Sequence, residues 1–313
     1  MEVSLNFSDV LIKPKFSNVS NENDVDLVRS FRFKYSKKTL SNVPVMCSNI
    51  DTVANFELFK VLSSYNMFTT FNKNMEVEEF KANKDLLEKY EDNFAISIGI
   101  SDCEIEKLHL INRILDFKCI CVDVENGHLI NFVNFCLRVR NNFPDKIIMA
   151  GNVVCKNMVY SLVTNGKVDV VKVGIGGGSN CSSRIKAGVG VPQLSAIMEC
   201  AYEAHLLGAH VISDGDITCP GDLGKSFGAG ADFVMICGKF DGHDQNPGNI
   251  IEQDGHKFKL FYGEGRILTI EYKGDLNDTV IDFLGGLRLL CTYTNSKNII
   301  ELHKNVTFIR VFS

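Results

Sequence analysis

The residue best suited to chemistry in this chain is a cysteine in a glycine-rich segment. Four glycines lie between positions 174 and 178, and Cys181 follows them, close to Ser183 and Arg184. Glycine lets a backbone approach a ligand or adopt positive φ, so such a loop can present N–H groups to phosphate or carbonyls to a cation. A thiol in a polar loop beside a cation is placed to ionise and attack an electrophile. The alternative is a loop cysteine with a structural role.

Other polar side chains come where short apolar runs end. They are Asn49, Asp51, Lys73, Asp123, Asn126, Asn152 and Asp214. For Asn49 and Asn152, capping of the following helix is an open alternative to a functional role. Glycine turns at Gly215 and Gly238 follow the last two runs, where barrels of parallel strands often bind phosphate. Tight turns would explain these glycines, but not Asp214 beside them.

Eight apolar, β-branched runs have to position these residues. They cover 43–47, 67–71, 94–99, 119–124, 146–151, 168–174, 209–215 and 231–238. Segments with helical periodicity lie between them, for example 80–90, 104–115 and 129–139. Apolar strands that alternate with helices predict an α/β fold with a parallel sheet covered on both faces. Eight units favour a (β/α)8 TIM barrel, and an open doubly wound sheet with fewer strands is the alternative.

We expect one domain over residues 1–313. An N-terminal arm covers 1–42, and a C-terminal extension over 247–313 should contain short strands and one helix, at 278–290. The glycine-rich loop, 174–184, should lead to a helix that begins near Pro192.

Composition excludes several classes of protein. The formal charge is −5, with 45% hydrophobic and 23% charged residues, as in soluble globular proteins and without the basic patch of a nucleic-acid binder. No apolar run approaches the ~18 residues that span a bilayer, so we expect no membrane partner. Eleven scattered cysteines without a CxxC pair indicate a reducing, cytoplasmic location and argue against structural zinc.

Several segments together closely resemble the reductases of the IMP dehydrogenase/GMP reductase family, and the resemblance runs from 5–15 to 307–311. The segments are MAGNVV (149–154), KVGIGGGSNCSSR (172–184), GVGVPQLSAIMEC (188–200), ISDGD (212–216), CPGDLGKSFGAGADFVM (219–235) and KLFYG (259–263). The resemblance implies a (β/α)8 barrel, usually a homotetramer, and NADPH-dependent reductive deamination of GMP to IMP and ammonia. IMP dehydrogenase is the sibling interpretation, but it carries a regulatory domain after the second strand, where 71–94 leaves room only for helix.

The resemblance also implies roles for individual residues. Cys181 would attack purine C2, with Ser183 and Glu264 as catalytic partners, and Asp214 would hold the ribose hydroxyls. The phosphate would be contacted by Ser179, Gly215, Gly238 and Tyr262. The cofactor side would include Gly174, and Lys73 and Asp123 near the nicotinamide and the leaving amine. Main-chain carbonyls of Gly176, Gly178 and Cys181 would bind K⁺.

The chain departs from the family pattern within this site. The family has a long flap between its Phe-Tyr-Gly motif and the catalytic Glu-Gly, whereas Gly263 here is followed directly by Glu264. Asp216 stands where the family has glycine, and Cys237 replaces the first of two glycines in the next turn. Ser183 replaces a threonine. Glu125 and His128 replace smaller or aromatic residues.

Two functions remain open. The retained set of Cys181, Ser183, Glu264, Asp214 and Lys73, with Asp123, favours an active reductase. The lost flap and Asp216 favour a catalytically impaired paralogue that acts as a nucleotide-binding or regulatory subunit.

Overall fold

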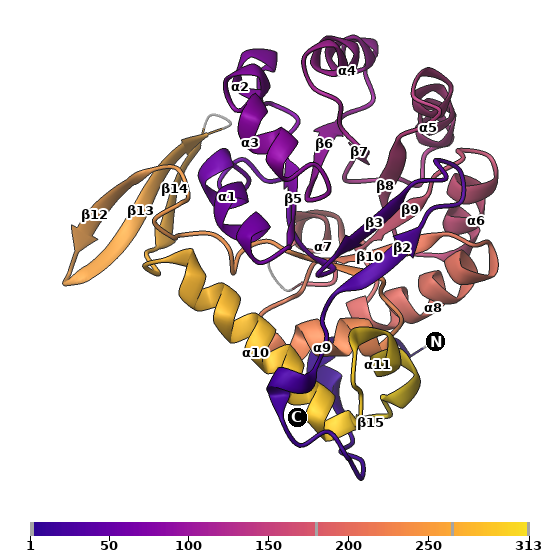
Figure 1. The fold of residues 1–313 in the computed structure, drawn as a ribbon, viewed down its shortest axis with the longest axis vertical. Helices are drawn as coiled ribbons and strands as arrows, with labels where there is room; N and C mark the ends of the chain where they lie inside the picture. The colour runs from indigo at the N-terminus through magenta and orange to yellow at the C-terminus, as the bar shows by residue number, and fades with distance from the viewer. Residues whose placement is uncertain (1–2, 179–180, 264–265, 312–313) are drawn as a thin grey trace.

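Eight parallel strands form the centre of the molecule. The computed structural model describes residues 3–178, 181–263 and 266–311. The strands are β4 (Val45–Cys47), β5 (Phe68–Phe71), β6 (Phe94–Ile98), β7 (Cys119–Asp123), β8 (Ile147–Val153), β9 (Val170–Val173), β10 (His210–Asp214) and β11 (Phe233–Ile236). They close into a barrel, which β11 completes by pairing with β4. Figure 1 shows helices arranged around these strands. The predicted (β/α)8 barrel is confirmed, and the open doubly wound sheet is wrong.

Helices cover the outside of the barrel. They are α1 (Phe56–Ser64), α2 (Val77–Ala82), α3 (Lys84–Lys89), α4 (Asp102–Ile114), α5 (Ile130–Asn142), α6 (Lys156–Thr164), α8 (Gln193–Leu206) and α9 (Pro220–Gly228). The continuous helical periodicity expected over 80–90 is interrupted at Asn83, which ends α2 and precedes α3. Its side-chain amide donates to the Glu79 carbonyl at 2.9 Å, a local bond that competes with the regular helix pattern.

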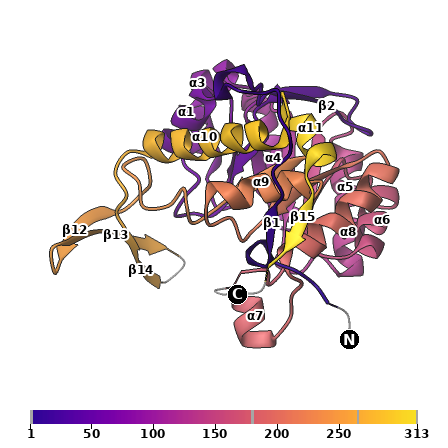
Figure 2. The same cartoon turned by 90° about the horizontal axis from the view of Figure 1, so that it is seen from below.

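Alternate residues of each strand point into and out of the barrel. Cys119 and Cys121 pack inside, while Ile120 and Val122 pack outward against helices. A hairpin of β2 (Arg29–Arg32) and β3 (Thr39–Asn42) closes one end, because Phe31, Phe33 and Leu40 join the interior cluster. Figure 2 shows β2 at this end and α7 (Ser182–Ala187) at the other. Part of the segment expected as an N-terminal arm, the β2–β3 hairpin, therefore closes the barrel at this end.

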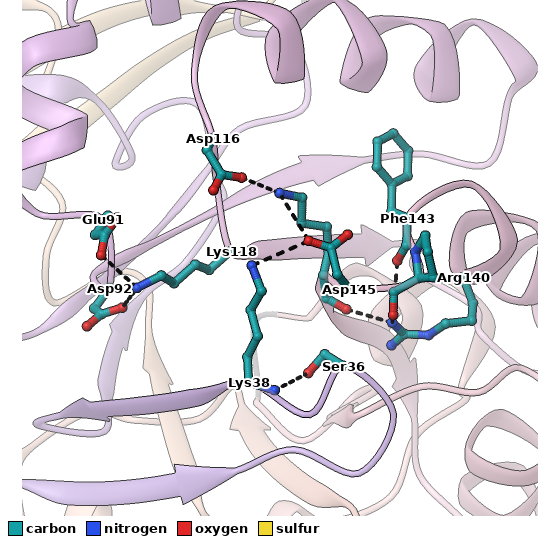
Figure 3. Close-up of polar contacts among 11 residues, drawn as sticks. Ser36, Lys38, Glu91, Asp92, Asp116, Lys118, Arg140, Phe143 and Asp145 are labelled. Atoms are coloured by element: carbon teal, nitrogen blue, oxygen red, sulfur yellow. Dashed lines mark hydrogen bonds and ion pairs between the residues drawn. The ribbon is translucent and has the colours of Figure 1, made fainter.

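Ion pairs surround the closed end. Lys118 lies 2.8 Å from Glu91 and 2.5 Å from Asp92, and Arg140 lies 2.6 Å from the buried Asp169 (Figure 3 shows Lys118 and Arg140). In such barrels, residues at the amino ends of the strands usually stabilise the fold, whereas catalytic residues lie at the carboxyl ends. We therefore assign these ion pairs to stability.

The remaining elements depart in part from expectation. α7 begins directly after Cys181, within the segment expected to be loop as far as 184. The tail contains two helices rather than one, α10 (Leu276–Thr294) and α11 (Ile299–Asn305). β12 (Asn249–Gln253), β13 (His256–Gly263) and β14 (Arg266–Glu271) form a sheet that projects from the barrel, and β1 (Val10–Ile12) pairs with β15 (Phe308–Arg310). Short 3₁₀ helices cover Phe7–Asp9 and Glu22–Asp24. Among the described residues, no helix is long and apolar enough to cross a membrane.

Candidate active site

The glycine-rich loop lies at the open end of the barrel, between β9 and α7. Cys181 is the residue that precedes the first turn of α7. Its N–H donates to the Gly178 carbonyl at 3.2 Å, and its own carbonyl accepts from Ile185 N–H at 3.0 Å. Cys181 is therefore held by backbone bonds on both sides, with its side chain half-buried.

Two glycines in this loop are required by the backbone and by close packing. Gly174 has a φ of +153° and Gly176 a φ of +67°. A Cβ on Gly174 would overlap the Asp214 carbonyl, and one on Gly176 would overlap the Val189 carbonyl. Larger residues would therefore displace the loop from the strand that carries Asp214.

The Cys181 thiol has partners that stabilise its ionised form. Its Sγ lies 3.2 Å from Ser183 Oγ. Partial burial raises the pKa of Cys181, but Ser183 Oγ and the backbone N–H groups of Gly176, Ser183 and Arg184 outweigh this and hold the pKa below its ordinary value. By contrast, burial raises the pKa of Cys121 in the barrel interior to about 12. Because the thiolate is the nucleophilic form, Cys181 is chemically distinct from the buried thiols.

A buried lysine that the sequence interpretation missed joins the two carboxylates at the barrel mouth. Lys172 on β9 is 1% exposed, and its Nζ binds Asp123 directly and lies 3.3 Å from Asp214 Oδ2. Burial alone would lower the pKa of Lys172, but Asp123 and then Asp214 hold it well above its ordinary value. Burial would likewise raise the pKa of Asp123, yet Lys172 holds it below the ordinary range. The signal available in the sequence was a lone lysine inside an apolar, β-branched run.

Asn152 connects this network to the cysteine loop. Its side-chain amide donates to the Gly174 carbonyl at 2.8 Å and to Asp214 Oδ2 at 2.9 Å. The Cys181 loop and Asp214 therefore lie at the same end of the barrel. Helix capping is excluded for Asn152, since the residue that caps α6 is Cys155.

Asn49 also faces this network rather than a helix end. Its Oδ1 lies 3.5 Å from Lys172 Nζ, and α1 is capped by Asn55 instead. The Asn49 carbonyl accepts from the Asn72 side chain at 2.7 Å, which links the loops after β4 and β5.

Two pockets open at this mouth. One, of about 190 Å³, is lined by Gly178, Gly215, Asp216, Ile217, Thr218, Met235, Cys237 and Gly238. The other, of about 300 Å³, is lined by Asn49, Ile50, Asp51, Asn72, Lys73, Asp123, Val124 and Glu125. The first thus brings together Gly215 and Gly238, and the second brings together Lys73 and Asp123.

Asp216 occupies a position that favours glycine. Its φ is +64°, in the left-handed region, which aspartate adopts more readily than most residues but at some cost. A Cβ on Gly178 would lie 3.3 Å from Asp216 Oδ1, so the carboxylate lies against the glycine loop. Burial and the neighbouring Asp222 raise the pKa of Asp216 above its ordinary value, and Arg184 opposes them in part. A carboxylate is therefore held beside the smaller pocket.

Several of the expected site residues cannot be placed. Ser179 and Glu264 lie outside the described residues, as does the side chain of Tyr262. The backbone around them is informative, because Gly263 at the end of β13 pairs with Arg266 at the start of β14. Only two residues separate these strands, so β13 and β14 are joined as a hairpin without a long intervening segment.

Comparisons with known proteins agree with this architecture. A family model described as an IMP dehydrogenase / GMP reductase domain matches residues 4–270. The chain is 49% identical to a GMP reductase of Caenorhabditis elegans, over 99% of this chain and 92% of the relative. It is 44% identical to GMP reductase 1 of Rattus norvegicus and 43% identical to GMP reductase 1 of Homo sapiens, in each case over 99% of this chain and 96% of the relative. The nematode match spans 336 aligned positions against 313 residues here, so that relative has residues without a counterpart in this chain.

Proposed function

The chain belongs to the IMP dehydrogenase/GMP reductase family, and from this membership we propose a function as a GMP reductase. The enzyme is an NADPH-dependent oxidoreductase of purine metabolism that converts GMP to IMP and ammonia. The observation that carries the proposal is a thiol of lowered pKa, Cys181, on the same barrel mouth as Asp214 and Asp123. A nucleophile, a carboxylate for the ribose and a carboxylate for the amine are the groups that this reaction needs.

We assign the nucleophilic step to Cys181. Its thiolate adds to purine C2, the exocyclic amine takes up one proton from solvent and leaves as ammonia with the electron pair of the C–N bond, and the product is a thioimidate between Sγ and C2. NADPH, held on the side of Lys73 and Asp123, would supply the hydride for C2, and breaking of the C–S bond would restore the Cys181 thiolate. Ser183 Oγ, at 3.2 Å from Sγ, supports the ionised thiol between turnovers. Glu264 is proposed as the third catalytic group from the family pattern alone.

The Lys172 network is assigned to positioning. Asp123 lies in the larger pocket with Lys73, and Lys172 keeps its carboxylate ionised beside the expected leaving amine. Asp214 is oriented by Asn152 at 2.9 Å for the ribose hydroxyls. Gly215 and Gly238 line the smaller pocket, which we assign to the phosphate. Ser179 and Tyr262 complete this set as proposals from the family pattern.

The larger pocket is the proposed cofactor side. Lys73 and Asp123 line it, and its volume of about 300 Å³ is at the lower limit for small-molecule pockets. Gly174 belongs to this side through its carbonyl, which Asn152 binds at 2.8 Å. These residues suit a nicotinamide, because Lys73 offers a cation and Asp123 and the Gly174 carbonyl offer hydrogen-bond acceptors.

We propose K⁺ as a ligand of the cysteine loop. The carbonyls of Gly178 and Cys181 each accept one backbone N–H, which leaves a lone pair on each for a cation. With the Gly176 carbonyl they form a set of neutral oxygen ligands on one short segment. A bound K⁺ would stabilise the loop conformation that presents the thiol. Replacing K⁺ with choline should then slow both turnover and alkylation of Cys181, and the second readout does not depend on substrate.

Two further properties, the oligomeric state and the cellular location, are proposed from the family, the surface of α8 and the cysteines. A homotetramer agrees with the family and with three apolar side chains on one face of α8, Met198, Tyr202 and Leu206, which are 50%, 69% and 66% exposed. Light scattering of the purified protein tests this. A cytoplasmic location agrees with the eleven free thiols.

The test of function is NADPH oxidation, followed at 340 nm with GMP, with the C. elegans relative as control. Oxidation that depends on GMP and disappears in Cys181→Ala supports the reductase. The second candidate, an impaired paralogue with a binding or regulatory role, is favoured by Asp216 beside the smaller pocket. GMP binding without NADPH oxidation would support that candidate.

A further inference from the structure

A further pocket lies at the closed end of the barrel, away from Cys181. Its volume is about 450 Å³. The walls come from β2, from the turn between α8 and β10, and from α11, which lies beside α9 at the end of the barrel seen in Figure 1. This size is within the ~300–1,000 Å³ of small-molecule pockets. None of the residues proposed for catalysis lines it.

The lining of this pocket is cationic in a protein of net charge −5. Its ionisable residues are Arg29, Arg32, Lys304, His205, His210, His303 and Asp232. Three of the chain's seven histidines therefore line this pocket, and two of them, His205 and His210, lie 2.8 and 3.5 Å from Asp232. Even with neutral histidines, three cations face one anion.

The only carboxylate that the described residues contribute to the lining of this pocket, that of Asp232, is hydrogen-bonded to other groups of the protein. Asp232 is 1% exposed, and its Oδ1 accepts from Arg29 Nη2 at 2.6 Å. Its Oδ2 accepts from the Val211 N–H at 2.9 Å and lies 2.8 Å from His205 Nε2. Asp232 therefore orients Arg29 and His205, and the positive charge of Arg29 offsets the negative charge of the carboxylate.

Other cations at the rim have no such partner. Among the described residues, Arg32 and Lys304 have no ion-pair partner, and both are exposed. The remaining wall is apolar, with Phe227, Ile299 and Ile300. Unpaired cations beside an oriented arginine and an apolar wall suit a ligand with a multiply charged anionic group and an organic body.

We propose that this pocket binds a small organic phosphate, at a site separate from the catalytic mouth. A phosphate carries up to two charges and three acceptor oxygens, which matches the surplus of donors better than a carboxylate does. The apolar wall contacts the organic part. The site does not depend on the activity proposed above.

Phenyl phosphate is a suitable probe, because it combines the anionic group with an apolar ring. Titration into protein with ¹³C-labelled histidine rings should shift the signals of His205 and His303 saturably. His128, which hydrogen-bonds Val154 N–H near the catalytic mouth, reports binding at that end. Signals are assigned with single His→Gln variants. Benzoate, with the same ring and a single charge, should bind at least about tenfold more weakly.

Charge reversal at the rim supplies the decisive comparison. Arg32→Glu with Lys304→Glu should weaken phenyl phosphate binding at least about tenfold, the equivalent of one lost charge-assisted hydrogen bond. Lys15→Glu with Lys60→Glu makes the same change in net charge at exposed sites outside the pocket and should leave affinity unchanged. Shifts confined to His128, equal weakening by both double variants, or benzoate binding as tight as phenyl phosphate would each overturn the proposal.

Discussion

Replacement of Asp216 is the most direct test of whether its carboxylate weakens the binding of the GMP phosphate. The carboxylate lies against Gly178 and lines the pocket assigned to phosphate, at a position where the family resemblance implies glycine. At ~5 Å and an effective dielectric constant of ~20, two unit charges repel by roughly 3 kcal/mol. Because Asp216 is only partly buried, screening by solvent and salt reduces this. We expect Asp216→Gly to bind GMP about 10- to 100-fold more tightly, as measured by calorimetry.

A second variant, Asp216→Asn, separates the effect of the negative charge from the effect of backbone strain. Asp216→Asn keeps a side chain at φ +64° but removes the charge, so it should recover most of the gain if repulsion is the cause. Burial and Asp222 raise the pKa of Asp216, so its carboxylate takes up a proton at a higher pH than an exposed aspartate would. Lowering the pH from neutral toward this pKa should therefore narrow the difference in affinity between wild type and Asp216→Asn. The phosphate of GMP also protonates near pH 6, and this affects its binding to both proteins. Taking the ratio of the two GMP affinities at each pH removes that shared effect.

The result that would refute this reasoning is equal GMP affinity in wild type, Asp216→Gly and Asp216→Asn. It would mean that the carboxylate turns to solvent or that the phosphate lies elsewhere. A gain in Asp216→Gly without a gain in Asp216→Asn would assign the effect to backbone strain instead of charge.

Three further predictions concern the same mouth. Cys181 should be alkylated by iodoacetamide faster than the ten other thiols at neutral pH, because its pKa is lowered; peptide mapping that finds another cysteine labelled first would contradict this. Lys172→Met should destabilise the protein by about 3–5 kcal/mol in urea unfolding, because it leaves two carboxylates without their buried partner, whereas unchanged stability would show that water replaces the ammonium. From the family resemblance, which implies a flap between Gly263 and Glu264, we predict low turnover, because a site without that lid would admit water and misplacement of a catalytic group by about 1 Å costs ~100-fold. Grafting a relative's flap between Gly263 and Glu264 should raise NADPH oxidation, and a graft of scrambled sequence is the control.

Much of the fold could be predicted because its signal is local. Each barrel strand coincides with an apolar, β-branched run, as β7 does with 119–124. α7 could not be predicted, because its six residues follow a glycine-rich segment and carry no apolar periodicity. α11 was missed for a similar reason, since seven residues are too short for a clear period.

Part of the site could also be predicted, again because the signal lies in neighbouring residues. Cys181 was identifiable from its neighbours in sequence, because glycines and hydroxyl residues next to a thiol are a local pattern. Asn49 and Asn152 stayed ambiguous, since an amide after a strand suits a helix cap and a binding site equally. Only the structure shows that both face Lys172 or Asp214.

The sequence by itself determined the alternation of strand and helix, the eight units that suit a barrel, and the loop that carries the thiol. These follow from side-chain periodicity and from glycine, which act on neighbouring residues. Only the tertiary structure decided that Lys172 joins Asp123 to Asp214, that Phe31 closes the barrel, and that His205 and His210 meet Asp232. Those groups lie far apart along the chain, and the energy of a buried charge depends on which partners the closed barrel brings within hydrogen-bond distance.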